Sequence, residues 1–80
     1  MDREEVKEKV YSILNSSGFG NIIDENYYFN NDLGLDSMDV VEFTIEIEKE
    51  FNIALSDENM EALYHLNVGK AIDMIHDQVK

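Results

Sequence analysis

The segment from Ser37 to about Phe51 constrains the fold more than any other part of the chain, because its pattern is strongly helical and it contains neither glycine nor proline. Asp36 precedes it and is suited to cap the helix, since its carboxylate can accept hydrogen bonds from free N–H groups of the first turn. Gly34 permits the sharp change of chain direction that this entry needs. Ser37 therefore takes the first helical position, with its hydroxyl exposed at the positive end of the helix dipole.

This helix is expected to carry two apolar stripes on opposite faces. At about 100° per residue, the smaller stripe consists of Met38, Val41 and Ile45. The larger stripe lies opposite and has five members: Val40, Phe43, Thr44, Ile47 and Phe51. A small domain cannot bury both faces of a helix fully, so we expect the larger stripe to face the core. The smaller stripe stays partly exposed beside Ser37, with an acidic border formed by Asp39, Glu42, Glu46 and Glu48.

The acidic composition bears on what could bind the smaller stripe. Six lysine and arginine residues stand against 18 aspartate and glutamate residues, which gives a net charge of −12. This balance argues against nucleic acid and anionic membranes as partners and favours proteins with basic patches. An apolar stripe with an acidic border suits a transient partner site. Two other interpretations stay open: the acidity serves solubility alone, or the preceding loop covers the stripe.

Three further helices are expected around this one. Residues 3–16 carry apolar side chains at helical spacing, namely Val6, Val10, Ile13 and Leu14. A short third helix begins after Ser56, which can cap it, and ends near Tyr64. Asn67 caps a last helix, whose apolar face is formed by Val68, Ala71, Ile72, Ile75 and Val79.

Residues 17–36 form a connection that is too long to be idle in a compact domain unless it is packed. It carries eight apolar residues that can be buried against the helices: Phe19, Ile22, Ile23, Tyr27, Tyr28, Phe29, Leu33 and Leu35. Packing of the loop on the core explains its Tyr27-Tyr28-Phe29 cluster better than an aromatic binding site does. The fold class that we predict is therefore an all-α, four-helix bundle with three longer helices, a short third helix and this long loop.

A chain of 80 residues is long enough for one small domain, and we expect residues 1–80 to form it. There is no cysteine, so the sequence predicts no disulfide, cysteine metal site or thiol nucleophile. The first residues do not resemble a signal or transit peptide, and no apolar run approaches the length of a membrane span. We therefore expect a cytoplasmic monomer that does not insert into membranes.

Two kinds of chemistry at Ser37 are not supported. A serine nucleophile needs a nearby base, whereas the only histidines are His65 and His76 and there is no Gly-x-Ser-x-Gly motif. A calcium loop ending at Glu42 would place leucine at two positions where oxygen ligands are required. The sequence thus predicts neither a catalytic residue nor a dedicated metal site, although the clustered carboxylates leave weak divalent binding open.

The motifs around Ser37 resemble those of the acyl carrier protein family. They are Asp32-Leu33-Gly34, Asp36-Ser37-Met38-Asp39, Val41-Glu42 and Glu48-Lys49-Glu50-Phe51, and the resemblance extends from about Val6 to Ile75. It implies that Ser37 carries a 4′-phosphopantetheine arm through a phosphodiester, installed from coenzyme A by a phosphopantetheinyl transferase. The thiol of the arm would hold acyl intermediates as thioesters and present them to the enzymes of fatty acid synthesis.

Two groups of residues are expected to serve this carrier role. The group that would contact the transferase and the synthesis enzymes comprises Asp36, Met38, Asp39, Val41, Glu42, Ile45 and Glu48. The group that would line an opening acyl cavity comprises Phe29, Phe43, Thr44, Ile47, Phe51, Met60, Leu63 and Ile72. Thr44 departs from the aliphatic residue usual in the family. A hydroxyl there is unfavourable for a long alkyl chain unless it bonds back to the helix backbone.

The resemblance thus predicts a carrier and not an enzyme. Within the carriers, the alternative is a protein dedicated to another acyl pathway, such as polyketide, lipid A or surface acylation. The alternative from another class is an unmodified acidic helical adaptor whose exposed stripe binds a basic helix. The intact mass of the chain after expression with a phosphopantetheinyl transferase separates the carriers from the adaptor.

Overall fold

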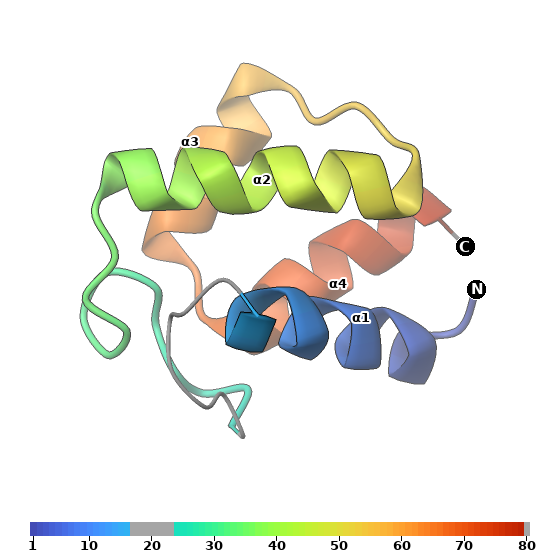
Figure 1. Ribbon diagram of the computed structural model, residues 1–80, viewed down its shortest axis with the longest axis horizontal. Helices are drawn as coiled ribbons and strands as arrows, with labels where there is room; N and C mark the ends of the chain where they lie inside the picture. The colour runs from blue at the N-terminus through green and yellow to red at the C-terminus, as the bar shows by residue number, and fades with distance from the viewer. Residues whose placement is uncertain (17–23, 80) are drawn as a thin grey trace.

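The computed structural model describes residues 1–16 and 24–79 and shows an all-α fold (Figure 1). The four helices of this part are α1 (Arg3–Ser16), α2 (Ser37–Phe51), α3 (Asp57–His65) and α4 (Val68–Val79). The same residues contain no strand beyond one isolated antiparallel bridge, between Tyr28 and Asn67. The predicted bundle of three longer helices and one short third helix is confirmed, and each helix begins where the sequence placed it.

Helix α2 begins and ends at residues that suit those positions. The Asp36 carboxylate accepts a hydrogen bond from the Asp39 N–H at 2.9 Å, and the Asp39 carboxylate accepts one from the Asp36 N–H at 3.2 Å. This reciprocal pair is a capping box and fixes the first turn. Gly34, with a φ of +67°, provides the turn before the helix, and Asn52 ends the helix in the left-handed region.

The helices bury one face each in a common core. On α2 the buried residues are the five expected from helical spacing: Val40, Phe43, Thr44, Ile47 and Phe51. Helices α1 and α4 contribute Val6, Val10, Leu14, Val68, Ala71, Ile72 and Ile75. Helix α3 contributes one buried residue, Leu63. Because apolar burial is the main force that fixes a helix in a small domain, α3 is the least firmly anchored of the four.

Residues 24–29 are fixed to the junction between α3 and α4 by three backbone hydrogen bonds. They run from Phe29 N–H to the Leu66 carbonyl at 3.3 Å, from Val68 N–H to the Tyr27 carbonyl at 2.8 Å, and from Gly69 N–H to the Glu25 carbonyl at 2.8 Å. The last contact is so close that a Cβ at Gly69 would lie 2.9 Å from Glu25 Oε1. The connection that leads into α2 is therefore hydrogen-bonded to residues 66–69, which lie far from it in the sequence.

The expected burial of the long connection is confirmed in part. Phe29 and Leu35 are buried in the core, and Tyr27 and Leu33 are half-buried against it. Tyr28 differs from expectation, since 40% of its side chain is exposed. Its backbone carries the bridge to Asn67, and successive side chains of an extended segment point to opposite sides. Three further residues predicted to be buried fall outside the described residues: Phe19, Ile22 and Ile23.

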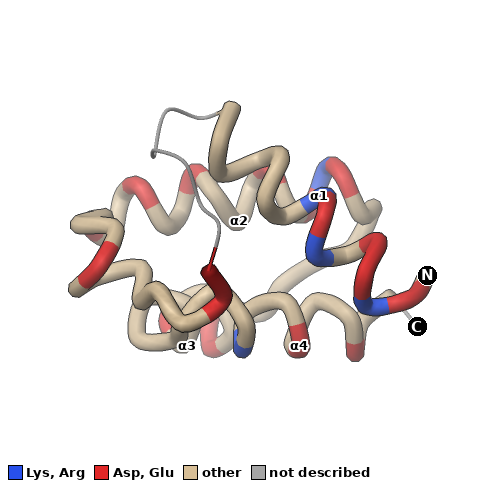
Figure 2. Tube along the Cα trace, turned by 90° about the horizontal axis from the view of Figure 1, so that it is seen from below, with Lys and Arg blue, Asp and Glu red and all other residues tan. Residues whose placement is uncertain are grey.

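A charged network ties α1 to the connection and to α4. Arg3 Nη2 lies 2.6 Å from Glu25 Oε1, and Arg3 Nε lies 2.6 Å from Asp73 Oδ1. Lys7 Nζ lies 3.3 Å from the other oxygen of the Glu25 carboxylate. Hydrogen bonds from Arg3, and then from Lys7, hold the pKa of Glu25 below its ordinary value, although partial burial opposes them. Figure 2 shows basic residues gathered mainly on α1, and acidic residues scattered over the helices, α1 included.

Candidate functional site around Ser37

Ser37 is the first residue of α2, and its side chain is exposed. The capping box fixes where the helix begins, so the Ser37 hydroxyl is held at the positive end of the helix dipole. Within residues 1–16 and 24–79 this hydroxyl makes no hydrogen bond. It is therefore open to an incoming group, and an anion attached to it would lie where the helix dipole favours negative charge.

The smaller apolar stripe of α2 is exposed beside Ser37, as the helical spacing predicted. The exposed fractions are 74% for Met38, 47% for Val41 and 42% for Ile45. Residues 24–36 of the long connection leave all three side chains exposed. This part of the loop therefore does not cover the stripe. Glu42 and Glu46 are also exposed at the edge of the stripe.

The other two residues of this border, Asp39 and Glu48, and the neighbouring Asp36 have structural contacts of their own. Asp36 and Asp39 cap α2 through each other's backbone N–H groups. The Glu48 carboxylate accepts a hydrogen bond from the Leu55 N–H at 2.9 Å and so holds the link to α3. A substitution at any of these three positions would therefore remove a local structural contact as well as change the surface.

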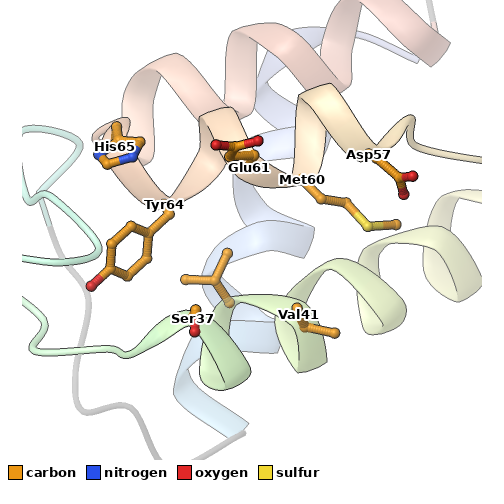
Figure 3. Close-up of a pocket in the computed structure, with 8 residues that line it drawn as sticks. Ser37, Val41, Asp57, Met60, Glu61, Tyr64 and His65 are labelled. Atoms are coloured by element: carbon orange, nitrogen blue, oxygen red, sulfur yellow. The ribbon is translucent and has the colours of Figure 1, made fainter.

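A pocket of about 450 Å³ lies between α2 and α3, beside Ser37 (Figure 3). We call it the α2–α3 pocket, and its lining consists of Ser37, Val40, Val41, Asp57, Met60, Glu61, Tyr64 and His65. Figure 3 shows Met60 and Tyr64 extending from α3 toward α2. The serine is thus part of the wall of a pocket that combines apolar side chains with hydrogen-bonding groups.

Most residues predicted to line an acyl cavity lie in the closed core instead of this pocket. Seven of them have at most 7% of their side chain exposed: Phe29, Phe43, Thr44, Ile47, Phe51, Leu63 and Ile72. Met60 is the one predicted cavity residue in the lining of the α2–α3 pocket. Helical spacing identifies side chains that face inward, and such side chains fill the interior at high density. Their role toward an acyl chain stays a prediction that requires the core to open.

Helix α3 supplies pocket residues that the sequence did not predict as site residues. They are Asp57, Glu61, Tyr64 and His65. A signal for them was present, because positions 57, 60, 61, 64 and 65 follow the three- and four-residue spacing of one helix face. That face mixes polar and apolar residues, so its period does not stand out as a hydrophobic stripe.

His65 shares the pocket with Ser37 and is a histidine near a hydroxyl. A general base must lie within hydrogen-bonding reach of the group that it deprotonates. In the part of the chain that the structure describes, no hydrogen bond joins His65 to Ser37, and the His65 ring contacts Tyr64 edge-on at 5.2 Å between centroids. The same residues contain no group of three or more acidic or histidine side chains that could hold a metal ion.

Comparison with known proteins adds an independent line of evidence. Residues 20–75 match the family described as the phosphopantetheine attachment site. The acyl carrier protein of Cyanidium caldarium is 40% identical, over 96% of this chain and 90% of its own length. That of Chlorobium phaeobacteroides is 40% identical, over 94% and 96%. The mitochondrial acyl carrier protein of Neurospora crassa is 36% identical, over 98% of this chain and 59% of its own.

These matches agree with the geometry around α2. The matched region contains the capped helix start, and two relatives align over at least nine-tenths of their own length. Acyl carrier proteins are carriers rather than catalysts. The chain therefore belongs to the acyl carrier protein family and is a carrier with a 4′-phosphopantetheine prosthetic group.

Proposed function

We propose that Ser37 is the attachment point of the 4′-phosphopantetheine arm and that the chain carries acyl intermediates of fatty acid synthesis. The observation that carries the proposal is the exposed Ser37 hydroxyl at a capped helix start within the matched residues 20–75. That region contains one other serine, Ser56. The Ser56 hydroxyl accepts a hydrogen bond from the Asn59 N–H at 3.1 Å and caps α3. The Ser37 hydroxyl makes no hydrogen bond to any of the described residues.

The residues around Ser37 fit the chemistry of attachment. In the transfer, the Ser37 oxygen forms a bond to the pantetheine-side phosphorus of coenzyme A and loses its proton. The pyrophosphate bond breaks, and adenosine 3′,5′-bisphosphate leaves. The resulting phosphodiester is an anion at the N-terminus of α2, where the dipole and the first-turn N–H groups favour it. The arm ends in a thiol that holds an acyl group as a thioester.

The hydrogen bond of Thr44 removes an objection to an apolar cargo. This residue is fully buried, and its hydroxyl donates to the Val41 carbonyl at 2.7 Å. A hydroxyl that is bonded back to its own helix offers no unpaired donor to an alkyl chain. The departure from an aliphatic residue at this position is therefore compatible with a fatty acyl chain among the predicted cavity residues.

The partners that we propose are a phosphopantetheinyl transferase and acyl-transfer enzymes with basic, partly apolar docking surfaces. The smaller stripe and the exposed carboxylates of Glu42 and Glu46 support this, because they complement such surfaces. Of the described helices, none combines the length and apolarity needed to cross a membrane. A cytoplasmic location and a monomeric state stay predictions, and one relative carries a mitochondrial name.

The attachment is tested by incubating the chain with coenzyme A and a transferase and measuring its intact mass. We expect one phosphopantetheine on the wild type and none on Ser37→Ala. Because the chain has no cysteine, the modified protein should also gain its only thiol-reagent signal. The matched control is Ser56→Ala, which should be loaded normally although it loses a helix cap worth about 1 kcal/mol.

Loading of Ser37→Ala, or no loading of the wild type by any transferase tried, would refute the proposal. No loading would leave the unmodified adaptor as the better interpretation. If loading occurs, the acyl groups found on the arm after isolation from cells distinguish fatty acid synthesis from polyketide, lipid A or surface acylation pathways.

A further inference from the structure

We propose that Met38 is a site of reversible oxidation and that its sulfoxide weakens docking of the carrier to the transferase. The inference rests on the proposed function, because it takes the smaller stripe as the docking surface. Its first support is exposure, since 74% of the Met38 side chain is exposed. Met60 and Met74 are instead half-buried against the core. A small oxidant in solvent therefore reaches Met38 without any opening of the fold.

The second support is the position of Met38 within the docking surface. It is the second residue of α2, directly after Ser37, and it forms the smaller stripe with Val41 and Ile45. The other well-exposed methionine of the described residues is Met1, at 46%. Figure 1 shows the N-terminus at the opposite end of the molecule from the start of α2. Of these two methionines, only Met38 places its oxidation where it changes docking.

The oxidant that we infer is a peroxide, and the step balances with it. The Met38 sulfur attacks one oxygen of hydrogen peroxide, so that an S–O bond forms while the O–O bond breaks. The proton on the transferred oxygen passes to the departing hydroxide, and water leaves. The sulfur loses two electrons and the peroxide gains them. Thiol-dependent methionine sulfoxide reductases reverse the change, with a disulfide and water as the other products.

The sulfoxide weakens docking because it changes the polarity of the stripe. A thioether is apolar and adapts its shape to a partner surface, whereas a sulfoxide carries a polar oxygen. Burial of that oxygen against an apolar partner surface is unfavourable unless a donor meets it. The neighbouring carboxylates of Glu42 and Glu46 are exposed acceptors and offer no donor. We expect the dissociation constant for the transferase to rise about tenfold, the size of a single strong interface contact.

The test uses the full chain before loading. This chain has no cysteine and four methionines, so mild hydrogen peroxide acts chiefly on the methionines. Peptide mapping should find the first oxygen added within the described core and α2 on Met38, ahead of Met60 and Met74. After removal of the peroxide, the separated Met38 sulfoxide form is given coenzyme A and transferase. Its loading at concentrations well below KM should be about tenfold slower than that of the untreated chain, and a sulfoxide reductase should restore it.

Two variants, each compared with its own untreated sample, locate the effect. Met38→Leu keeps an apolar side chain without sulfur, so peroxide should leave its loading rate unchanged. Met74→Leu is the matched control, because it removes a half-buried methionine and keeps Met38. Its loading should slow after peroxide as much as that of the wild type.

Four results would overturn the inference. They are oxidation of Met60 or Met74 ahead of Met38, unchanged loading of the Met38 sulfoxide form, an equal loss of rate in peroxide-treated Met38→Leu, and a fall in the melting temperature of the sulfoxide form that accounts for its slower loading. The last would assign the loss to the fold, whereas an exposed side chain should leave the melting temperature unchanged. Failure of the proposed function looks different, since the untreated chain then gains no arm at all.

Discussion

At the scale of single residues, the carboxylates near the smaller stripe are of two kinds. Asp36, Asp39 and Glu48 accept hydrogen bonds from the backbone and hold the two ends of α2 in place. Glu42 and Glu46 are exposed and have no hydrogen bond or ion pair among the described residues. The sequence predicted Asp36 as the helix cap and the other four as one acidic border, because helical spacing reports which face a residue lies on and not what its carboxylate binds. Substitutions of Glu42 and Glu46 therefore test docking without removing a hydrogen bond that holds α2.

Glu42→Lys should lower the association rate with the transferase by about tenfold at low salt, because steering by charge acts on the encounter step. The difference from wild type should shrink as salt rises, since the screening length falls to about 8 Å at physiological ionic strength. The matched control is Glu8→Lys, the same charge change at an exposed position on α1. Association rates measured at two salt concentrations check this. Equal slowing by both variants would show that only net charge matters.

At the scale of elements, periodicity predicted the helices and their buried faces well, because both depend on local sequence. The five core residues of α2 are the clearest case. Contacts between distant segments were not predictable in this way. The bonds that join residues 24–29 to residues 66–69 depend on how the chain returns on itself. The α2–α3 pocket likewise depends on the separation of two helices, which no helical wheel reports.

Gly69→Ala is a test of that distant contact. Alanine favours a helix over glycine by about 1 kcal/mol, so the substitution should stabilise α4 if nothing lies against it. A Cβ at this position would instead lie 2.9 Å from Glu25 Oε1, 3.1 Å from Glu25 Cβ and 3.3 Å from the Glu25 carbonyl oxygen. The carboxylate tip can move, but the other two atoms belong to a segment fixed by hydrogen bonds. We therefore expect a lower melting temperature, and a higher one would show that residues 24–29 yield easily.

At the scale of the whole molecule, charge is unevenly distributed. Residues 36–61 contain nine acidic residues and one lysine, whereas α1 carries Arg3, Lys7 and Lys9. Each of these three cations is paired with a carboxylate from another part of the chain. Arg3 joins residues as far apart as Glu25 and Asp73. These ion pairs thus join α1 to other parts of the bundle. The surface around Ser37 remains acidic.

Glu25→Gln should lower the free energy of unfolding at pH 7 by on the order of 1 kcal/mol, because networks of partly buried charges exceed isolated surface pairs. The Glu25 side chain is 29% exposed and meets two cations, Arg3 and Lys7. The matched control is Glu50→Gln, which makes the same change of net charge. Glu50 meets Lys9 at 2.9 Å and is 46% exposed. We expect its loss to cost clearly less in denaturant titrations at pH 7.

The pH dependence of this difference follows from the lowered pKa of Glu25. A carboxyl whose folded pKa lies below its unfolded value stabilises the fold above the unfolded pKa, about pH 4 to 5. That stabilisation is lost as the pH falls through the folded pKa, because the folded state must then take up a proton as well. The gap between wild type and Glu25→Gln should therefore be full at pH 6 to 7 and close progressively below about pH 4. A gap that persists unchanged at low pH would mean that Glu25 acts by packing against Gly69 and not through its charge.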